Sequence, residues 1–270
     1  MPTHPALLDY LAVEFQESGW DLQALLKKMV LSYTYRQSSI ADATLQEKDP
    51  LNTWLARGVS YRLPAEMIRD NALAASGLLV QKVGGESVKP YQPEGLWIDL
   101  GNFSNRLLHY KEDEGDKLYR RSLYTFIRRT SPPPFMTTFD VASRDKCNIQ
   151  REQTNTPLQA LILMNDPQFV EASRVLAVRM QQEGGASTAD QIQYAFRLAT
   201  GRKAKQKEVA LLEELFQKEK SRFQQSPKEV KGILEVGKYP QAQQFNKSTT
   251  AALAIVANTI LNHDEAYMKR

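Results

Sequence analysis

The stretch from residue 154 to residue 167 constrains the fold most, because it fixes where one helix begins, where it ends and where another begins. Thr156 suits the N-cap, Pro157 suits the first helical position, and Gln159 completes a capping box. The triplet Asn165-Asp166-Pro167 then repeats the combination of helix stop and helix cap. The sequence therefore predicts two helices in succession.

Apolar residues recur at helical spacing in many other places. Leu7, Leu11 and Phe15 predict a first helix, Asp21 caps a second, and Asp49-Pro50 predicts the start of a short third helix. Further helices are predicted around residues 61–77, 119–127, 157–162, 169–180, 192–199, 209–216 and 249–261, and a capping box at residues 226–229 predicts one more N-terminus.

These elements predict an all-α fold, an irregular multi-helix domain with long ordered loops. Residues 83–113, rich in glycine, proline and aromatic residues, show no sustained period and predict one such loop; long loops in compact domains are often functional. We expect residues 1–270 to form a single helical domain, which would divide near residues 150–156 if it held two parts. The abrupt opening at residues 1–5 suggests the C-terminal part of a longer protein.

The composition argues against several kinds of site. The 35 basic and 31 acidic residues leave a formal net charge of only +4, which does not indicate nucleic-acid binding. The single cysteine, Cys147, excludes an internal disulfide, and His4, His109 and His263 show no metal-ligand spacing. No apolar run reaches the ~18–20 residues that span a bilayer. We therefore expect no metal, no cofactor, no nucleic-acid partner and no membrane span.

Positive charge nevertheless gathers between Lys117 and Arg151, where eight Lys or Arg residues face Asp140 and Asp145, a local excess of six. Guanidinium groups bind carboxylates, phosphates and sulfates through a rigid fork of donors, so convergent arginines would form an anion site. The helix N-terminus after Thr156 would favour an anion as well. Alternatively, the arginines pair with acidic residues and tie the loops to the helices, which is the interpretation we favour.

The candidate ligand-binding residues follow from this cluster and from the predicted helix over residues 119–127, which would align several of them along one stripe. They are Arg62, Arg69, Arg120, Arg121, Tyr124, Arg128, Arg129, Arg144, Arg151, Thr154 and Asn155. The acidic residues expected to neutralise the arginines are Glu66, Asp70, Asp140, Asp145 and Asp166.

No catalytic motif is present, and only weak candidates for chemistry remain. Glu66 and Asp70 lie four residues apart, so a helix would place both carboxylates on one face, where they could act as acid and base. A helix face stabilised by salt bridges to Arg62 and Arg69 is the commoner explanation of this spacing. Cys147 could be a nucleophile activated by basic neighbours, but free cysteine is usually buried, and we expect burial.

Six motifs in order resemble one family, the planctomycete-type PSD-one domain, a secreted domain of unknown function. The motifs are YRLPAEMIRD (61–70), LYRRSLYTFIRRTSPPP (118–134), FDVASRDKC (139–147), TNTPLQALILMNDPQF (154–169), FRLATGR (196–202) and ANTILNHDEA (257–266). The resemblance extends from about Leu7 to Glu265 and implies a periplasmic, cell-envelope or secreted location. It also implies upstream partner domains, commonly a second domain of unknown function and a planctomycete-type cytochrome c domain.

The chain itself contains no Cys-x-x-Cys-His motif and no signal peptide, so the resemblance assigns no haem to these residues. Three hypotheses about function stay open. The first is a helical binding module of a larger envelope protein that recognises an anionic carbohydrate, such as an acidic or sulfated polysaccharide. The second is a hydrolytic domain with a site of carboxylates and arginines, and the third is a structural domain that docks on upstream domains, for which an exposed apolar face near residues 7–15 would argue.

Overall fold

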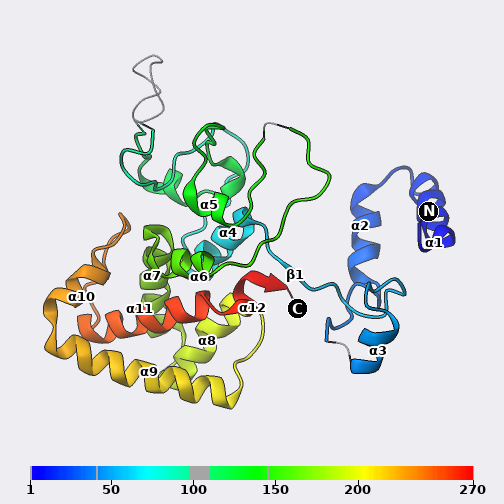
Figure 1. The fold of residues 1–270 in the computed structure, drawn as a ribbon. Helices are drawn as coiled ribbons and strands as arrows, with labels where there is room; N and C mark the ends of the chain where they lie inside the picture. Colours follow the sequence, from blue (N-terminus) through cyan, green and yellow to red (C-terminus); the bar gives the residue numbers. More distant parts are fainter. Residues whose placement is uncertain (1, 41, 98–109, 145, 270) are drawn as a thin grey trace. The chain divides into compact units, whose positions relative to one another are not determined.

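The computed structural model describes residues 2–40, 42–97, 110–144 and 146–269 (Figure 1). The chain divides into two compact units, the first formed by Met1–Tyr61 with Met268–Arg270 and the second by Arg62–Tyr267. The division therefore falls between Tyr61 and Arg62, whereas residues 150–156, where the sequence suggested a division, lie inside the second unit. The prediction of an all-α fold is confirmed.

The first unit contains α1 (Pro5–Glu17), α2 (Leu22–Leu31) and α3 (Ala43–Lys48). The two helices predicted here are confirmed and pack on each other as a hairpin, and the Asp21 carboxylate accepts a hydrogen bond from the Ala24 amide at 3.0 Å, which caps α2 as predicted. The helix predicted to begin at Asp49-Pro50 is wrong. Asp49 follows the end of α3, and its carboxylate accepts from the backbone amides of Thr53 and Trp54 at 2.7 and 2.8 Å, which folds this stretch into turns.

From residue 61 onward the elements are mostly helices, with η2 and η3 as short 3₁₀ helices and β1 and β2 as a two-stranded sheet. In chain order they are β1 (Tyr61–Arg62), α4 (Ala65–Ser76), η2 (Gly115–Tyr119), η3 (Ser122–Tyr124), α5 (Pro134–Thr138), α6 (Pro157–Asn165), α7 (Pro167–Glu183), α8 (Thr188–Thr200), α9 (Gln206–Gln225), α10 (Pro227–Leu234), α11 (Lys247–Leu261), α12 (Asp264–Tyr267) and β2 (Met268–Lys269).

The core of the second unit lies around α7 and α11, which pack against each other. Alanines at positions 251, 252, 254 and 257 are buried in α11 and allow the neighbouring helices to approach closely. α4 and α8 cover α7, while α9 runs along the other side of α11, as the yellow and red ribbons of Figure 1 show. None of the described helices is both long enough and apolar enough to cross a bilayer.

α4 begins later than the sequence predicts. Pro64 precedes the first helical residue, Ala65, and biases Leu63 towards extended backbone, so the helix does not reach back to Arg62, which lies in strand β1. Gly77 ends α4 in the left-handed conformation, as predicted, with φ at 82°. The apolar face predicted for α4 is half correct, because Ile68 and Leu73 are buried whereas Met67 and Ala74 are exposed.

The helix predicted over residues 119–127 is wrong. Only η2 and η3 form there, because the backbone groups of this segment bond to distant parts of the chain. The Tyr119 carbonyl accepts from the Val80 amide at 2.9 Å, and the Tyr124 carbonyl accepts from the Val88 amide at 2.8 Å. Tertiary hydrogen bonds therefore replace the helical ones. Arg121, Tyr124 and Arg128 consequently share no helical stripe.

The helix boundaries around Thr156 and Asp166 are confirmed. Gln159 Oε1 accepts from the Thr156 amide at 3.5 Å in a capping box, and Asp166 Oδ1 accepts from the Gln168 amide at 2.9 Å at the start of α7. On the predicted apolar face of α6, 54% of the surface of Leu161 is exposed. That face is therefore largely exposed. At Ser226 the predicted capping box is wrong, since α10 begins there without a capping bond from that side chain in the described structure.

Candidate functional site

Arg62 ties three separated segments together. Its guanidinium group donates to the Thr154 carbonyl at 2.8 Å, to the Phe139 carbonyl at 3.2 Å and to the Asp140 carboxylate at 2.6 Å. Thr154 returns to the same carboxylate through its amide at 2.8 Å and its hydroxyl at 3.0 Å. These bonds from Arg62 and Thr154 hold the pKa of Asp140 below its ordinary value despite the opposing effect of burial.

Arg69 is the most deeply buried member of the cluster, with 2% of its surface exposed. It donates to the Leu118 carbonyl at 2.6 Å, the Arg120 carbonyl at 2.9 Å and Gln168 Oε1 at 2.5 Å, and more weakly to the Ser122 hydroxyl at 3.2 Å. Burial lowers its pKa to about 10. Arg69 therefore joins α4 to the connector after residue 115 and to the start of α7, and it offers nothing to a ligand.

Arg120 is also buried and donates to three backbone carbonyls, those of Lys82 at 2.9 Å, Gly84 at 2.6 Å and Glu86 at 3.2 Å. Its guanidinium carbon lies 3.9 Å from the centre of the Tyr124 ring, a cation–π contact. Arg120 and Tyr124 therefore shape the loop after residue 80.

The other basic candidates lie nearer the surface. Arg121 is half exposed, 3.9 Å from Asp70, and Arg128 lies over the Trp97 ring at 5.2 Å. Arg129, Arg144 and Asn155 are exposed. The candidate residues thus do not converge on one anion site, and the structure uses the buried arginines to tie loops to helices.

The carboxylates of Glu66 and Asp70 are likewise engaged. They share α4 as predicted, and Arg151 donates to Glu66 through two nitrogens at 2.8 and 3.2 Å. Burial would raise the pKa of Glu66, but the Arg151 hydrogen bonds outweigh it, and the pKa lies below its ordinary value. Asp70 accepts from the Ser122 amide at 2.7 Å. Neither Arg62 nor Arg69 pairs with Glu66, contrary to the prediction.

Cys147 is exposed, so the prediction of a buried cysteine is wrong. Its segment between α5 and α6 is fully at the surface from residue 146 to residue 156. His109 and Asp145, named in the sequence analysis, lie outside the described residues. Within the described ranges, no group of three or more His, Cys, Asp or Glu side chains is arranged to hold a metal ion.

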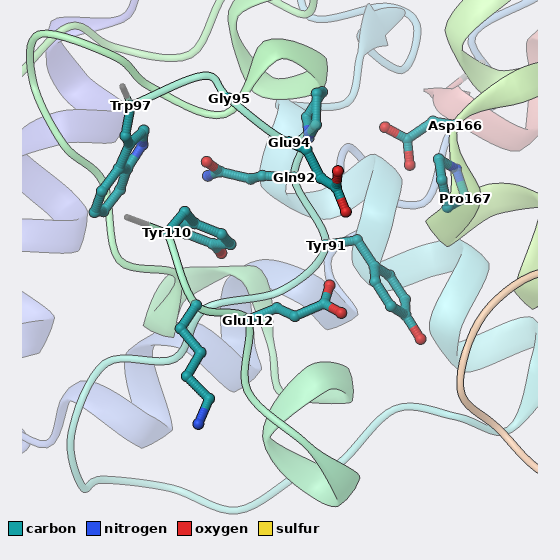
Figure 2. A pocket seen from close by; sticks show the side chains of 11 residues that line it. Tyr91, Gln92, Glu94, Gly95, Trp97, Tyr110, Glu112, Asp166 and Pro167 are labelled. Carbon is teal, nitrogen blue, oxygen red and sulfur yellow. The ribbon is translucent and has the colours of Figure 1, made fainter. Parts of the chain in front are cut away.

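A cavity of about 730 Å³ lies elsewhere in the second unit, between three segments of chain (Figure 2). Residues 91–97 and 110–112 belong to the long loop that the sequence predicted, and residues 166–167 form the junction of α6 and α7. The lining residues are Tyr91, Gln92, Pro93, Glu94, Gly95, Trp97, Tyr110, Lys111, Glu112, Asp166 and Pro167.

Among the described lining residues of this cavity, carboxyl groups prevail, from Glu94, Glu112 and Asp166, against the ammonium group of Lys111. Glu112 has an ion pair outside the lining, with Lys238 at 2.5 Å. Burial raises the pKa of Asp166 above its ordinary value, and the Gln168 hydrogen bonds offset this only in part. An acidic site of this kind favours ligands without negative charge.

Two polar groups in the cavity wall lack a hydrogen-bond partner within the described structure. They are the side-chain amide of Gln92, at both its nitrogen and its oxygen, and the indole nitrogen of Trp97, whose residue is only 2% exposed. In Figure 2 the Gln92 side chain extends towards Trp97 and Tyr110, whose rings meet edge to face at 5.0 Å. Unpartnered buried polar groups cost about 1–3 kcal/mol each, so they mark where a ligand or water would be stabilised.

A buried hydrogen-bond network fixes the wall behind Tyr91. Glu171, 1% exposed, accepts from the hydroxyls of Tyr91 and Tyr119 at 3.2 and 3.1 Å and from the Tyr239 amide at 2.7 Å. Its carboxylate also lies 3.7 Å from the Arg174 guanidinium. Burial raises the pKa of Tyr91 to about 12, so its hydroxyl stays a donor at neutral pH.

The sequence indicated the region of this cavity without naming its residues. The aromatic loop at residues 83–113 was the available signal, and Asp166 was noticed only as a helix cap and an ion-pair partner. The spacing of residues along the chain does not predict that this loop lies beside Asp166, nor that the Gln92 amide lacks a partner. Both depend on contacts between distant segments.

Comparison with known proteins gives a family and no function. Residues 1–216 match a family described as PSD1, protein of unknown function (DUF1553), while residues 217–270 lie beyond the matched region. No curated protein and no solved structure matches the chain. The match confirms the resemblance of the motifs, and the chain belongs to the PSD1 family of proteins of unknown function (DUF1553).

Proposed function

We propose that the chain is a helical binding module whose ligand enters the cavity between residues 91–97, residues 110–112 and the junction of α6 and α7. The proposed ligand is a basic, hydroxyl-rich molecule, of which an amino sugar is the simplest example. The observation that carries this proposal is the excess of carboxyl groups around an aromatic-walled cavity. The PSD1 match leaves the function open, and we place the module in a larger envelope or secreted protein as part of the proposal.

The sign of the charge supports this ligand class. The buried arginines that could have attracted an anion donate to carbonyl groups and to Asp140, whereas Glu94 stands exposed at the cavity rim. An anionic polysaccharide would meet carboxylates there, and like charges at close range repel by about 1 kcal/mol or more. An ammonium group would be attracted by the same carboxylates and by the faces of the tyrosine rings.

The neutral groups support a hydroxyl-rich ligand. The Gln92 amide presents one donor group and one acceptor, and the Trp97 indole presents one donor, all without partners in the described structure. A ligand with neighbouring hydroxyl groups both donates and accepts, so it could satisfy both residues after small side-chain shifts. The rings of Tyr91 and Tyr110 add apolar surface for a sugar ring.

The experiment compares three oligosaccharides of similar size that differ in charge: oligoglucosamine, which is cationic, its N-acetylated form, which is neutral, and oligoglucuronate, which is anionic. Calorimetric titration of the 270-residue chain at low and high salt would measure each affinity. We expect the amino sugar to bind at least about 10-fold more tightly than the acetylated form, less so at high salt, and the glucuronate not to bind. Tighter binding of the glucuronate, or no binding of any of the three, would overturn the proposal.

A matched pair of variants locates the binding. Glu94→Gln removes a carboxylate at the cavity rim, and Glu152→Gln removes an exposed carboxylate outside the cavity. We expect the first change to weaken amino-sugar binding about 10-fold and the second to leave it unchanged. Equal effects of the two changes would show attraction by net charge alone.

One observation favours hydrolysis as a second candidate function. Asp166 combines a pKa raised by burial with a position in the cavity wall, which it shares with the carboxyl groups of Glu94 and Glu112, and glycoside hydrolysis uses a pair of carboxyl groups. Incubating the same oligosaccharides with the chain between pH 4 and pH 7 would test it. Hydrolysis is favoured if the wild type forms product and the Asp166→Asn variant does not. Substrate that stays intact at every pH would exclude hydrolysis of these oligosaccharides and leave binding as the proposed function.

A further inference from the structure

The α1–α2 hairpin exposes apolar side chains that the first unit does not cover. No residue of either helix is buried, and large apolar side chains keep about half of their surface. On α2, Leu22, Leu26 and Met29 follow one another at spacings of four and three, with 57%, 50% and 44% exposed, and on α1 Leu8 keeps 56%. They form an apolar stripe of the kind that normally faces another helix.

Two helices of this length need a partner. α1 has 13 residues and α2 has 10, and isolated helices shorter than about 12–15 residues are marginal in water. Leu11, Phe15 and Leu25 are only partly covered by the hairpin itself. A pair of helices packed on each other through one narrow seam leaves a second apolar side, which a four-helix bundle would bury.

The charges identify the partner. α1 is acidic, with Asp9, Glu14 and Glu17, and α2 is basic, with Lys27 and Lys28. Lys28 already donates to Glu14 within the hairpin. A twofold axis that places α1 of one copy against α2 of another therefore brings opposite charges together, as a self-complementary surface requires.

We propose that the α1–α2 hairpin is a self-association surface that pairs with the hairpin of a second copy of this chain in a four-helix bundle. The surface is small. Helices of about 15–20 Å in length and about 10 Å in width present on the order of 400 Å² per copy, below the ~800 Å² per partner of a standard stable interface. An interface of this size is typical of weak, reversible association.

Sedimentation equilibrium of the 270-residue chain between about 5 and 500 μM tests the proposal. Leu22→Glu with Leu26→Glu is expected to raise the dissociation constant at least about 20-fold. The matched control is Leu158→Glu with Leu161→Glu on α6, two leucines that are 52% and 54% exposed in the second unit, and it should leave association unchanged. Circular dichroism of each variant shows that the helices are retained.

Charge exchange separates self-association from other binding. Lys27→Glu alone should weaken the dimer, and adding Asp9→Lys should restore it, because only a second copy carries both changes. A wild-type chain that stays monomeric at 500 μM would overturn the proposal. So would loss of the dimer in the α6 control, failure of the charge exchange to restore it, or binding of the wild-type hairpin to anionic vesicles without dimerisation.

Discussion

The arginine-rich connector between residues 116 and 151 and the wall of the cavity differ in what happens to their charges. In the connector and its neighbours, Arg62, Arg69 and Arg120 are buried and donate mainly to backbone carbonyls. Around the cavity, Glu94 stands exposed and the carboxyl group of Asp166 is only half-buried. The charge that a ligand meets is therefore the charge left after the fold has bonded its own groups.

The physical reason lies in the geometry of the two kinds of group. A guanidinium group has five donors, so it can hold several carbonyl groups at once and is stabilised in the interior without a carboxylate partner. Arg120 is such a case, with three carbonyl acceptors and the face of Tyr124. Counting acidic residues near arginines therefore underestimates how much positive charge a fold can bury.

The largest loss of stability is expected when Arg69 is replaced. Arg69→Ala removes donors from the carbonyls of Leu118 and Arg120 and from Gln168, and we expect a loss of about 3–5 kcal/mol in unfolding free energy. Arg121→Ala removes a half-exposed guanidinium 3.9 Å from Asp70 and should cost no more than about 0.5 kcal/mol. Urea unfolding of both variants measures the difference, and equal losses would contradict the assignment of Arg69 as an internal tie.

The buried hub at Glu171 gives the next largest effect. Gly237 has a φ of 82°, and a Cβ added there would lie within van der Waals overlap of the Glu171 carboxylate. Gly237→Ala should therefore cost about 2–4 kcal/mol, combining backbone strain with overlap. Gly201 is the matched control, because it has a φ of 81° but open space around it. Gly201→Ala therefore introduces backbone strain without overlap and should cost only about 1 kcal/mol. A Gly237→Ala variant as stable as Gly201→Ala would show that the network behind Tyr91 is loose.

A smaller, pH-dependent effect is expected at Glu66. Its pKa is lowered in the folded chain, so its contribution is present above the unfolded value of about 4.3 and is lost as pH falls through the folded value. Glu66→Gln should lower the unfolding free energy by about 0.5–1 kcal/mol at pH 7, since Arg151 is 42% exposed, and by less at about pH 3. A deficit that is the same at both pH values would refute the ion pair.

Asp166 should show an effect of similar size and opposite sign. Its pKa is raised in the folded chain, so the wild type loses stability as pH rises from about 3.9 through the folded value. Asparagine caps a helix about as well as aspartate, so Asp166→Asn should gain up to about 1 kcal/mol on the wild type between pH 3.5 and pH 7. Thermal unfolding at the two pH values measures this gain. If the stability of the variant relative to the wild type falls as pH rises, the burial of the carboxyl group is contradicted.

Local patterns predicted three helix caps correctly but failed at Asp49 and Ser226, and they gave no access to bonds between distant segments. The caps at Asp21, Thr156 and Asp166 were confirmed because each involves bonds within three residues. The helix predicted over residues 119–127 failed because the backbone carbonyls there bond to Val80, Val88 and Arg69.

The candidate site followed the same rule. The sequence located the arginines and favoured their pairing with acidic residues, which the bond from Arg62 to Asp140 bears out, whereas Arg69 bonds instead to the Leu118 carbonyl. It did not identify the carbonyl partners, because every residue carries a carbonyl group and spacing cannot select among them. The cavity could not be predicted from the sequence, because its walls come from residues about 70 positions apart along the chain.

The central claim is that the cavity carboxylates, and not the arginines of the connector, govern ligand charge preference. Calorimetric titration of oligoglucosamine and oligoglucuronate into Glu94→Lys and Arg121→Glu tests it most directly. We expect Glu94→Lys to weaken amino-sugar binding at least about 10-fold and Arg121→Glu to change it by less than about twofold. The claim is contradicted if Arg121→Glu changes the preference between the two oligosaccharides and Glu94→Lys does not.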